Sequence, residues 1–264
     1  AFPAEAQRQQ RRGAATAEQV QYPDATREEP GERAGPRLGP QINRMNDAMG
    51  RDEFDRVIEI AQGIVNNDRA NAYERSISYQ FLGAAHIEED DYASALRYFK
   101  RAVEENGLPN NSHFQLMLQI VQLHFAEDEY DEAIAALDEF MVQSGSKRPE
   151  HTALRGNILY RMDRFEDAAA ALRAALEASE EPNSSWQQLL MASLAEMEQP
   201  EEAARIAEDI VRRNPNDKSA LMNLASIYVQ ADMTDKAAEV LADARGRGLL
   251  TEARDYQTLY RLYL

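Results

Sequence analysis

The chain has 264 residues, of which 44% are hydrophobic, and a formal net charge of −17. Its sequence has no cysteine, which excludes disulfides, thiolate metal sites and a cysteine nucleophile. Because residues 1–40 hold six arginines and six carboxylates, the whole negative excess lies after residue 40. Such a body would repel nucleic acid and anionic lipid headgroups. We therefore expect either a solvated acidic surface or a preference for a basic partner.

Residues 1–40 are expected to form a disordered or extended tail, because they hold five of the ten prolines and four of the twelve glycines. The start, "AFPAEAQ", suits a mature N-terminus left by a signal peptidase, which predicts an exported protein. Within the tail, "QYPDATREEP" carries one aromatic residue. This stretch is either a solvated spacer or a docking motif made by Tyr22, Pro23 and Arg27, for a groove of this chain or of another copy.

From residue 41 a pattern repeats along the chain. A small residue recurs at intervals of 38, 35, 35 and 34 residues from Ala95 to Ala237, and Val57 takes its place in an earlier unit. An aromatic residue usually precedes this anchor position by three, and larger apolar residues follow it by four and seven. These spacings predict pairs of antiparallel helices that bury their apolar faces by stacking. The anchor positions are Val57, Ala95, Ala133, Ala168, Ala203 and Ala237.

The stretches "LGAAHIEEDDYASALRYFKRAV" and "YRMDRFEDAAAAL" resemble tetratricopeptide repeats. The resemblance implies an all-α fold, a right-handed superhelical solenoid of about six helical hairpins followed by a capping helix. The first and fifth units depart from the pattern, with Val57 at the anchor and Pro200 in place of the aromatic. The expected units are 41–70, 74–109, 112–146, 149–181, 184–216 and 218–248, with the capping helix at 251–264.

Catalytic signatures are missing from the sequence: there is no phosphate-binding glycine loop, strained serine elbow or histidine pair at metal-ligand spacing. We expect a non-enzymatic protein without cofactor or metal. His86 and His124 fall nine residues before an anchor, as Tyr228 does, and are expected to line the core. His113 and His151 stand at the starts of first helices and are expected to cap a helix or lie on the surface.

The family resemblance also implies that the first helices line a concave groove for a protein or peptide. Side-chain amides there would bond the backbone of an extended segment, and Phe125 and Tyr160 would hold its side chains. Alternatively, these two aromatic residues only pack against neighbouring helices. The expected groove residues are Gln80, Ile87, Leu118, Gln122, Phe125, Asn157, Tyr160, Arg161, Gln188, Met222 and Ser226.

One subclass of the family is not expected. Its chaperone-binding members hold a terminal carboxylate with Lys and Asn at paired groove positions. The corresponding residues here are Gln80, Leu118 and Ala153, and only Asn157 matches.

The final stretch places Tyr256, Tyr260 and Tyr263 on one face of the expected last helix. This face either caps the last hairpin or forms an aromatic ridge for a partner or a second copy. The alternatives to a binding scaffold are therefore a self-assembling structural solenoid that uses this helix, or an accessory subunit of an envelope enzyme complex.

The order of "QYPDATREEP", the repeats and "GLLTEARDYQTLYRLYL" is similar to that of exported bacterial tetratricopeptide proteins described as candidate components of the TonB/ExbB/ExbD system. This resemblance implies a periplasmic location and partners among TonB-system or TonB-dependent receptor proteins. No apolar run approaches the roughly 20 residues that span a bilayer, so we expect no direct membrane insertion.

Overall fold

The computed structural model describes residues 20–31, 33–181, 183–253 and 255–257. The chain divides into two compact units, unit 1 (Ala1–Ser146) and unit 2 (Lys147–Leu264), and each is described by itself. Among the described residues no helix is both long and apolar enough to cross a membrane. Unit 1 holds α2 (Gly39–Met49), α3 (Phe54–Val65), α4 (Ala72–Glu88), α5 (Tyr92–Glu104), α6 (Asn110–Ala126) and α7 (Tyr130–Ser144). Unit 2 holds α8 (Pro149–Arg161), α9 (Phe165–Ala178), α10 (Ser184–Glu196), α11 (Pro200–Arg213), α12 (Lys218–Gln230) and α13 (Thr234–Gly246).

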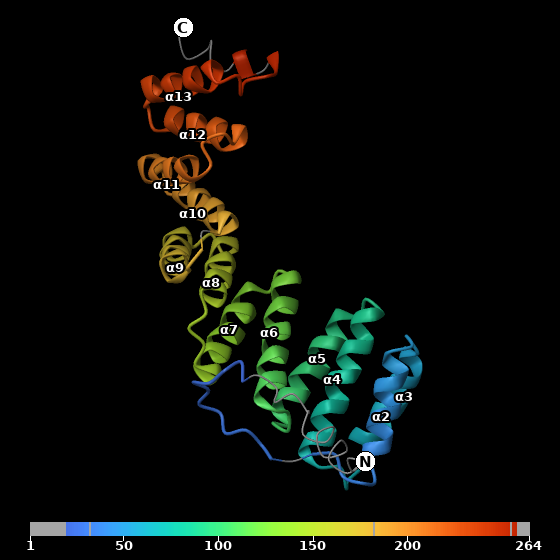
Figure 1. Ribbon diagram of the computed structural model, residues 1–264. Coiled ribbons are helices and arrows are strands. Elements are labelled where there is room, and N and C mark those ends of the chain that lie inside the picture. Colours follow the sequence, from blue (N-terminus) through green and yellow to red (C-terminus); the bar gives the residue numbers. More distant parts are fainter. Residues whose placement is uncertain (1–19, 32, 182, 254, 258–264) are drawn as a thin grey trace, which may run out of the picture. The chain divides into compact units, whose positions relative to one another are not determined.

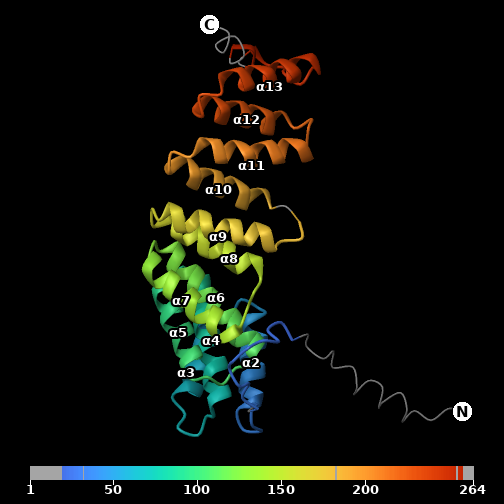
Figure 2. The ribbon, with the colours of Figure 1, turned by 90° about the vertical axis from the view of Figure 1, so that its left-hand side faces the viewer.

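Consecutive helices pair into hairpins, three in each unit, and each hairpin packs on the next one within its unit (Figure 1). In Figure 2, α10 to α13 lie one above another in the order of the sequence. The predicted all-α fold of repeated helical hairpins is thereby confirmed. Each hairpin exists because neither of its helices can bury its apolar stripe alone.

The anchor positions are buried in every hairpin. Four of the anchor alanines and Val57 are fully buried, and Ala203 is 3% exposed. Residues twelve before and four after each anchor complement one another in size. Gly83 lies against the ring of Phe99, whereas Met191 and Ala207 occupy the same two positions in the fifth hairpin. A small residue on one helix thus accommodates a large one on the other.

Every hairpin turns in the same way. One residue in each turn has φ between 55° and 58°, the left-handed region, and the next residue donates its N–H to a carbonyl five residues back. This bond satisfies a carbonyl that the end of the first helix leaves unpaired. Five of the six left-handed residues are aspartates, which tolerate this conformation better than most non-glycine residues. They are Asp52, Asp90, Asp128, Asp163, Glu198 and Asp232.

Residues 20–31 and 33–38 have extended or turn backbone and lie against unit 1. Of the two expected forms of the tail, disordered or extended, these residues therefore show the extended one. Tyr22 is 6% exposed and Leu38 is 2% exposed, so the segment buries these two large apolar side chains, whereas Val20 at its start is 69% exposed.

Candidate functional site

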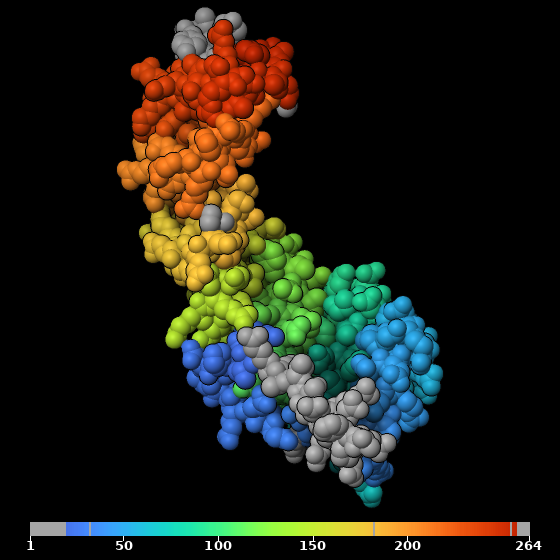
Figure 3. Space-filling view, viewed as in Figure 1, coloured from blue at the N-terminus to red at the C-terminus, as the bar shows by residue number. Residues whose placement is uncertain are grey.

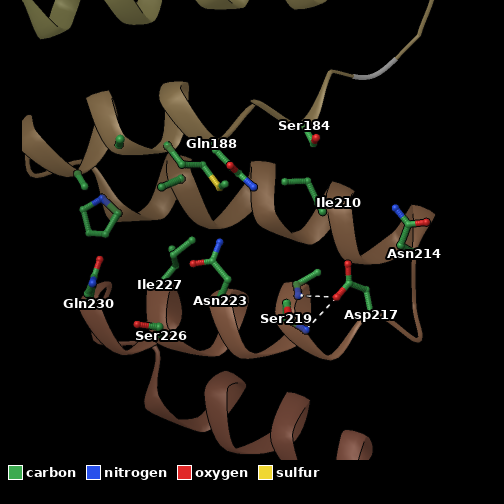
Figure 4. Close-up of a pocket in the computed structure, with 16 residues that line it drawn as sticks. Ser184, Gln188, Ile210, Asn214, Asp217, Ser219, Asn223, Ser226, Ile227 and Gln230 are labelled. Atoms are coloured by element: carbon green, nitrogen blue, oxygen red, sulfur yellow. Dashed lines mark hydrogen bonds between the residues drawn. The ribbon is translucent and has the colours of Figure 1, made fainter. Parts of the chain in front are cut away.

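Unit 2 has a pocket with a volume of about 710 Å³ between its first helices α10 and α12, with residues of α11 completing the wall (Figure 4). On α12, polar side chains recur at intervals of four, three and four residues, so they share one face of the helix. From α10, Gln188 points into the same space and lies across the pocket from Asn223. The polar residues of α12 that line the pocket are Ser219, Asn223, Ser226 and Gln230.

The pocket is held by a capped helix and an apolar floor. Asp217 caps α12, and its carboxylate accepts hydrogen bonds from the N–H groups of Ser219 (2.9 Å) and Ala220 (3.2 Å). Met191 and Ile227, 7% and 8% exposed, form part of the floor and belong to the core of unit 2. A rigid apolar floor with a polar rim is the usual construction of a recognition site.

The chemistry of the lining is that of neutral hydrogen bonding. Of its sixteen residues none is basic, and Asp217 is the one ionisable group. Amide side chains donate and accept hydrogen bonds at once, which matches the alternating groups of a peptide backbone. A lining of this kind has no cation with which to hold a terminal carboxylate.

The structure brings only part of the expected groove together in this pocket. Gln188 and Ser226 line it, but Met222 is half-buried and packs against the core of unit 2. Sequence reasoning missed Asn223 and Gln230, although the polar stripe of α12 was visible in the spacing of its residues.

Phe125 and Tyr160 each pack against the aromatic residue that begins the second helix of their own hairpin. The ring centroids are 5.7 Å apart for Phe125 and Tyr130, and 5.5 Å apart for Tyr160 and Phe165. Both side chains are half-buried, so this geometry favours the packing alternative over a role in gripping a ligand.

The other expected groove residues lie on first helices outside this pocket. Ile87 packs against the core formed by α5 and α6. Gln80, Leu118 and Asn157 are half-buried, whereas Gln122 and Arg161 are exposed.

The histidines divide into two pairs, and the first pair, His86 and His124, was expected to line the core. His124 is buried, and its Nδ1 lies 2.6 Å from Oε2 of Glu129. His86 stacks on Tyr98 with ring centroids 5.3 Å apart. His124 is therefore buried as expected, whereas His86 is half-buried. Of the described residues, no group of three His, Cys, Asp or Glu could hold a metal ion.

His113 and His151 were expected to cap a helix or lie on the surface, and the surface alternative was wrong, since they are 2% and 8% exposed. Burial, and then the nearby Arg27 guanidinium, lower the pKa of His113 to about 4, and a hydrogen bond that the ring makes to the side chain of Gln143 opposes this shift in part. Burial, followed by the charge of Arg148, also lowers the pKa of His151.

The segment after α13 packs onto the last hairpin where it is described. Lys218 Nζ lies 2.7 Å from Oδ2 of Asp255, which is 2% exposed, and this contact holds the pKa of Asp255 below its usual value. The hydroxyl of Tyr256 donates to the carbonyl of Leu250 at 2.9 Å. Tyr256 remains 36% exposed, and Tyr260 and Tyr263 lie outside the described residues.

Comparison with solved structures shows the same fold at low sequence identity. A tetratricopeptide repeat protein from Parabacteroides merdae matches with a TM-score of 0.58 and 14% identity, over 87% of this chain and 85% of its own. The protein YrrB, whose structure has an unusual peptide-binding site, matches with a TM-score of 0.52 and 17% identity, over 72% and 92%. MamA from Desulfovibrio magneticus RS-1 matches with a TM-score of 0.52 and 17% identity, over 65% and 93%.

Comparison with curated proteins gives no match. Comparison with family models gives two matches, which together cover the repeats. Residues 41–199 match the tetratricopeptide repeat-like domain, and residues 194–260 match a tetratricopeptide repeat. The first of these spans more than half of the chain. The chain therefore belongs to the tetratricopeptide repeat family.

Proposed function

We propose that this protein is a non-enzymatic interaction scaffold, and that its pocket in unit 2 holds an extended segment of a partner protein. The observation that carries the proposal is the pair of amides, Gln188 and Asn223, which face the same space from α10 and α12 above an apolar floor. Tetratricopeptide repeat domains serve generally as sites of protein or peptide binding, and this pocket lies between first helices, as such sites do.

Binding would combine two kinds of contact. The amides of Gln188, Asn223 and Gln230 supply donors and acceptors for the N–H and C=O groups of an extended chain. The floor made by Met191 and Ile227 supplies apolar surface for one of its side chains. The amides set the orientation of the bound segment, and the floor sets which side chain fits.

The partner segment is proposed to be basic. The chain has a formal net charge of −17, and the pocket lining contributes a carboxylate at Asp217 and no cation. Opposite charge speeds the encounter of two proteins more than it strengthens the complex. Added salt should therefore slow association with a basic segment, since it screens charges over about 10 Å at 0.1 M.

The proposed setting is the bacterial periplasm, with partners among the TonB-system or TonB-dependent receptor proteins. The support is the resemblance of "QYPDATREEP", the repeats and "GLLTEARDYQTLYRLYL" to exported proteins of that description. A basic, proline-rich extended segment of a periplasmic protein would suit both the acidic charge and the amide-lined pocket.

A titration tests the pocket itself. A fluorescently labelled Lys-Pro repeat peptide is added to the full chain and to a Gln188→Ala/Asn223→Ala variant. Each lost hydrogen bond costs about 0.5–1.5 kcal/mol, so the variant should bind about tenfold more weakly or worse. Gln122→Ala, an equally exposed glutamine on α6, is the matched control and should bind as the unaltered chain does. Equal affinity in all three proteins would move the site out of this pocket.

A capture experiment tests the setting. The full chain and the Gln188→Ala/Asn223→Ala variant are used side by side to capture proteins from a bacterial envelope extract. Enrichment of TonB-system or receptor proteins by the unaltered chain alone would support both the pocket and the partners. Enrichment by neither protein would remove the TonB assignment.

A further inference from the structure

Residues 21–29 run across the ends of three helices of unit 1. They contact the loop after α5, the start of α6 and the end of α7, and the side-chain hydrogen bonds of Thr26, Arg27 and Glu29 join residues 79 to 117 positions apart in the sequence. In Figure 3 this segment, in blue, lies against the green surface of the third hairpin. Because residues 21–29 are not part of a helix, the segment can leave this surface without breaking a hydrogen bond inside any helix.

The first residue that holds the segment in place is aromatic. The ring of Tyr22 meets Phe114 edge-on at 5.0 Å between centroids and Phe140 at 5.8 Å. Both phenylalanines are fully buried, and Tyr22 itself is 6% exposed. Edge-to-face packing of this kind is selective for an aromatic ring, because the positive ring edge meets a negative ring face.

The second residue that holds the segment is Arg27, through the several N–H groups of its guanidinium. Arg27 donates from Nε to Oδ1 of Asn106 at 2.7 Å, and from Nη2 to the carbonyls of Asn106 at 3.1 Å and Leu108 at 2.9 Å. Its Nη1 donates to Oδ1 of Asn110. A lysine ammonium cannot make this planar set of bonds, so the site selects arginine.

Two further residues of the segment complete helix ends. The residue before α6 is Pro109, which offers no side-chain cap, and Oε2 of Glu29 accepts the N–H of Asn110 at 2.9 Å instead. At the end of α7, Thr26 donates its N–H to the carbonyl of Gln143 at 2.9 Å. These are the groups that helices leave unsatisfied, so the surface is built to receive a peptide backbone and a carboxylate.

The backbone of the segment also approaches closely at Gly145, which ends α7 with φ of 62°. A Cβ atom there would lie 2.3 Å from the carbonyl oxygen of Asp24. Glycine is needed at this position both for its conformation and for the passage of residues 21–29.

We propose that this surface is a second peptide-recognition site, and that residues 21–29 are its built-in ligand. The ligand class is an extended segment with a tyrosine, an arginine five residues later and a carboxylate two residues after that. A partner segment with the same spacing competes with residues 21–29, so the chain's own segment keeps the site filled until it is displaced. The site lies in unit 1 and its proof or failure is separate from that of the pocket in unit 2.

The test uses the full chain with Tyr22→Ala and Arg27→Ala, which empties the site, and a fluorescently labelled synthetic peptide of residues 20–30. Fluorescence anisotropy should show binding to this variant at least tenfold tighter than to the unaltered chain, whose site is filled. Glu28→Ala, a change at an exposed residue of the same segment, should behave as the unaltered chain does. A peptide with alanine in place of tyrosine should not bind either protein.

Three results would overturn the proposal: no binding to the variant while its circular dichroism stays helical, equal binding to variant and unaltered chain, or no effect of a further Asn110→Ala change in the site. A mass of two chains for the unaltered protein and one for the variant would overturn occupancy within one chain. If the double variant does not fold, Arg27→Lys alone should raise peptide binding at least threefold over the unaltered chain, because it loses the fork but keeps the charge.

Discussion

Gly83 of α4 lies where the ring of Phe99 from α5 crosses it, and a single methyl group tests how tightly the hairpin is packed. An added Cβ would stand 2.3 Å from two carbons of the Phe99 ring, far inside normal contact at 3.4–4 Å. Phe99 is 3% exposed, so its ring has no solvent to move into. Overpacking costs about 1–3 kcal/mol, whereas replacing a helical glycine by alanine stabilises a helix by up to about 1 kcal/mol. Gly83→Ala should lower the free energy of unfolding by about 1–2 kcal/mol.

Gly63 of α3 provides the matched control, since an added Cβ there meets nothing within 4 Å. Gly63→Ala should raise the free energy of unfolding by about 0.5–1 kcal/mol. The hairpin of α12 and α13 suggests a rescue, because its Ala225 and Leu241 occupy the positions equivalent to Gly83 and Phe99. In a Phe99→Leu background, Gly83→Ala should therefore cost less than about 0.5 kcal/mol.

Urea unfolding followed by far-ultraviolet circular dichroism measures these differences. Emission of Trp186, the one tryptophan of the sequence, reports separately on unit 2, where α10 lies. A Gly83→Ala protein as stable as Gly63→Ala would refute the reasoning, because it would mean that the Phe99 ring shifts without cost. Equal losses in the Phe99 and Phe99→Leu backgrounds would show that the clash lies elsewhere.

The buried His113 should make stability depend on pH. Its pKa is about 4 in the folded chain and 6.5 ordinarily, so the unfolded chain takes up the proton at a higher pH than the folded chain does. The free energy of unfolding should therefore fall by up to about 3 kcal/mol as the pH drops from 6.5 to 4. Urea titrations at several pH values should show a flatter dependence on pH for His113→Gln. Asn71 caps α4 and accepts the N–H of Glu74 at 2.8 Å, so Asn71→Ala should lower the free energy of unfolding by about 1 kcal/mol, and no change in the urea midpoint would contradict the capping role. Lys218→Met removes the cation beside Asp255, so amides of residues 251–253 and 255–257 should exchange hydrogen faster than in the unaltered chain. Unchanged exchange would mean that other contacts hold the segment.

The repeats were predictable because each hairpin is specified locally. The anchor alanines and their apolar neighbours recur at helical spacing. A small residue on one helix and a large one on the next indicate a packed hairpin, whatever residues follow further along the chain. The helix ends show the limit of this reasoning. In the turns, an acidic residue such as Asp90 or Asp128 has the left-handed backbone conformation that glycine usually takes at the end of a helix. No general sequence signal marks a turn of this kind.

The candidate sites were less predictable because they depend on residues far apart in the sequence. In the sequence, Tyr22 is a lone aromatic residue in a polar tail. Its ring is buried because it packs against Phe114 and Phe140, which lie about 90 to 120 residues later in the sequence. His113 looked exposed for the same reason. In unit 2, the position of Gln188 followed from the family pattern, but its partner Asn223 required knowing how α10 and α12 face each other. For the expected groove residue Phe125, the sequence did not show that its ring packs against Tyr130 of the same hairpin.

The span of the contacts of residues 21–29 also orders events during synthesis. A ribosome adds about 5–20 residues each second, and helical hairpins with local contacts form far faster than that. The α4–α5 hairpin can thus close as it emerges, whereas Thr26 has to wait until Gln143, the acceptor of its N–H, has been made. During that delay of several seconds the Tyr22 ring stays open to water and to chaperones, and the face of Phe114, which is made later, stays open to any competing peptide until Tyr22 packs on it. The earliest-made described segment of unit 1 is consequently the last to reach its native place.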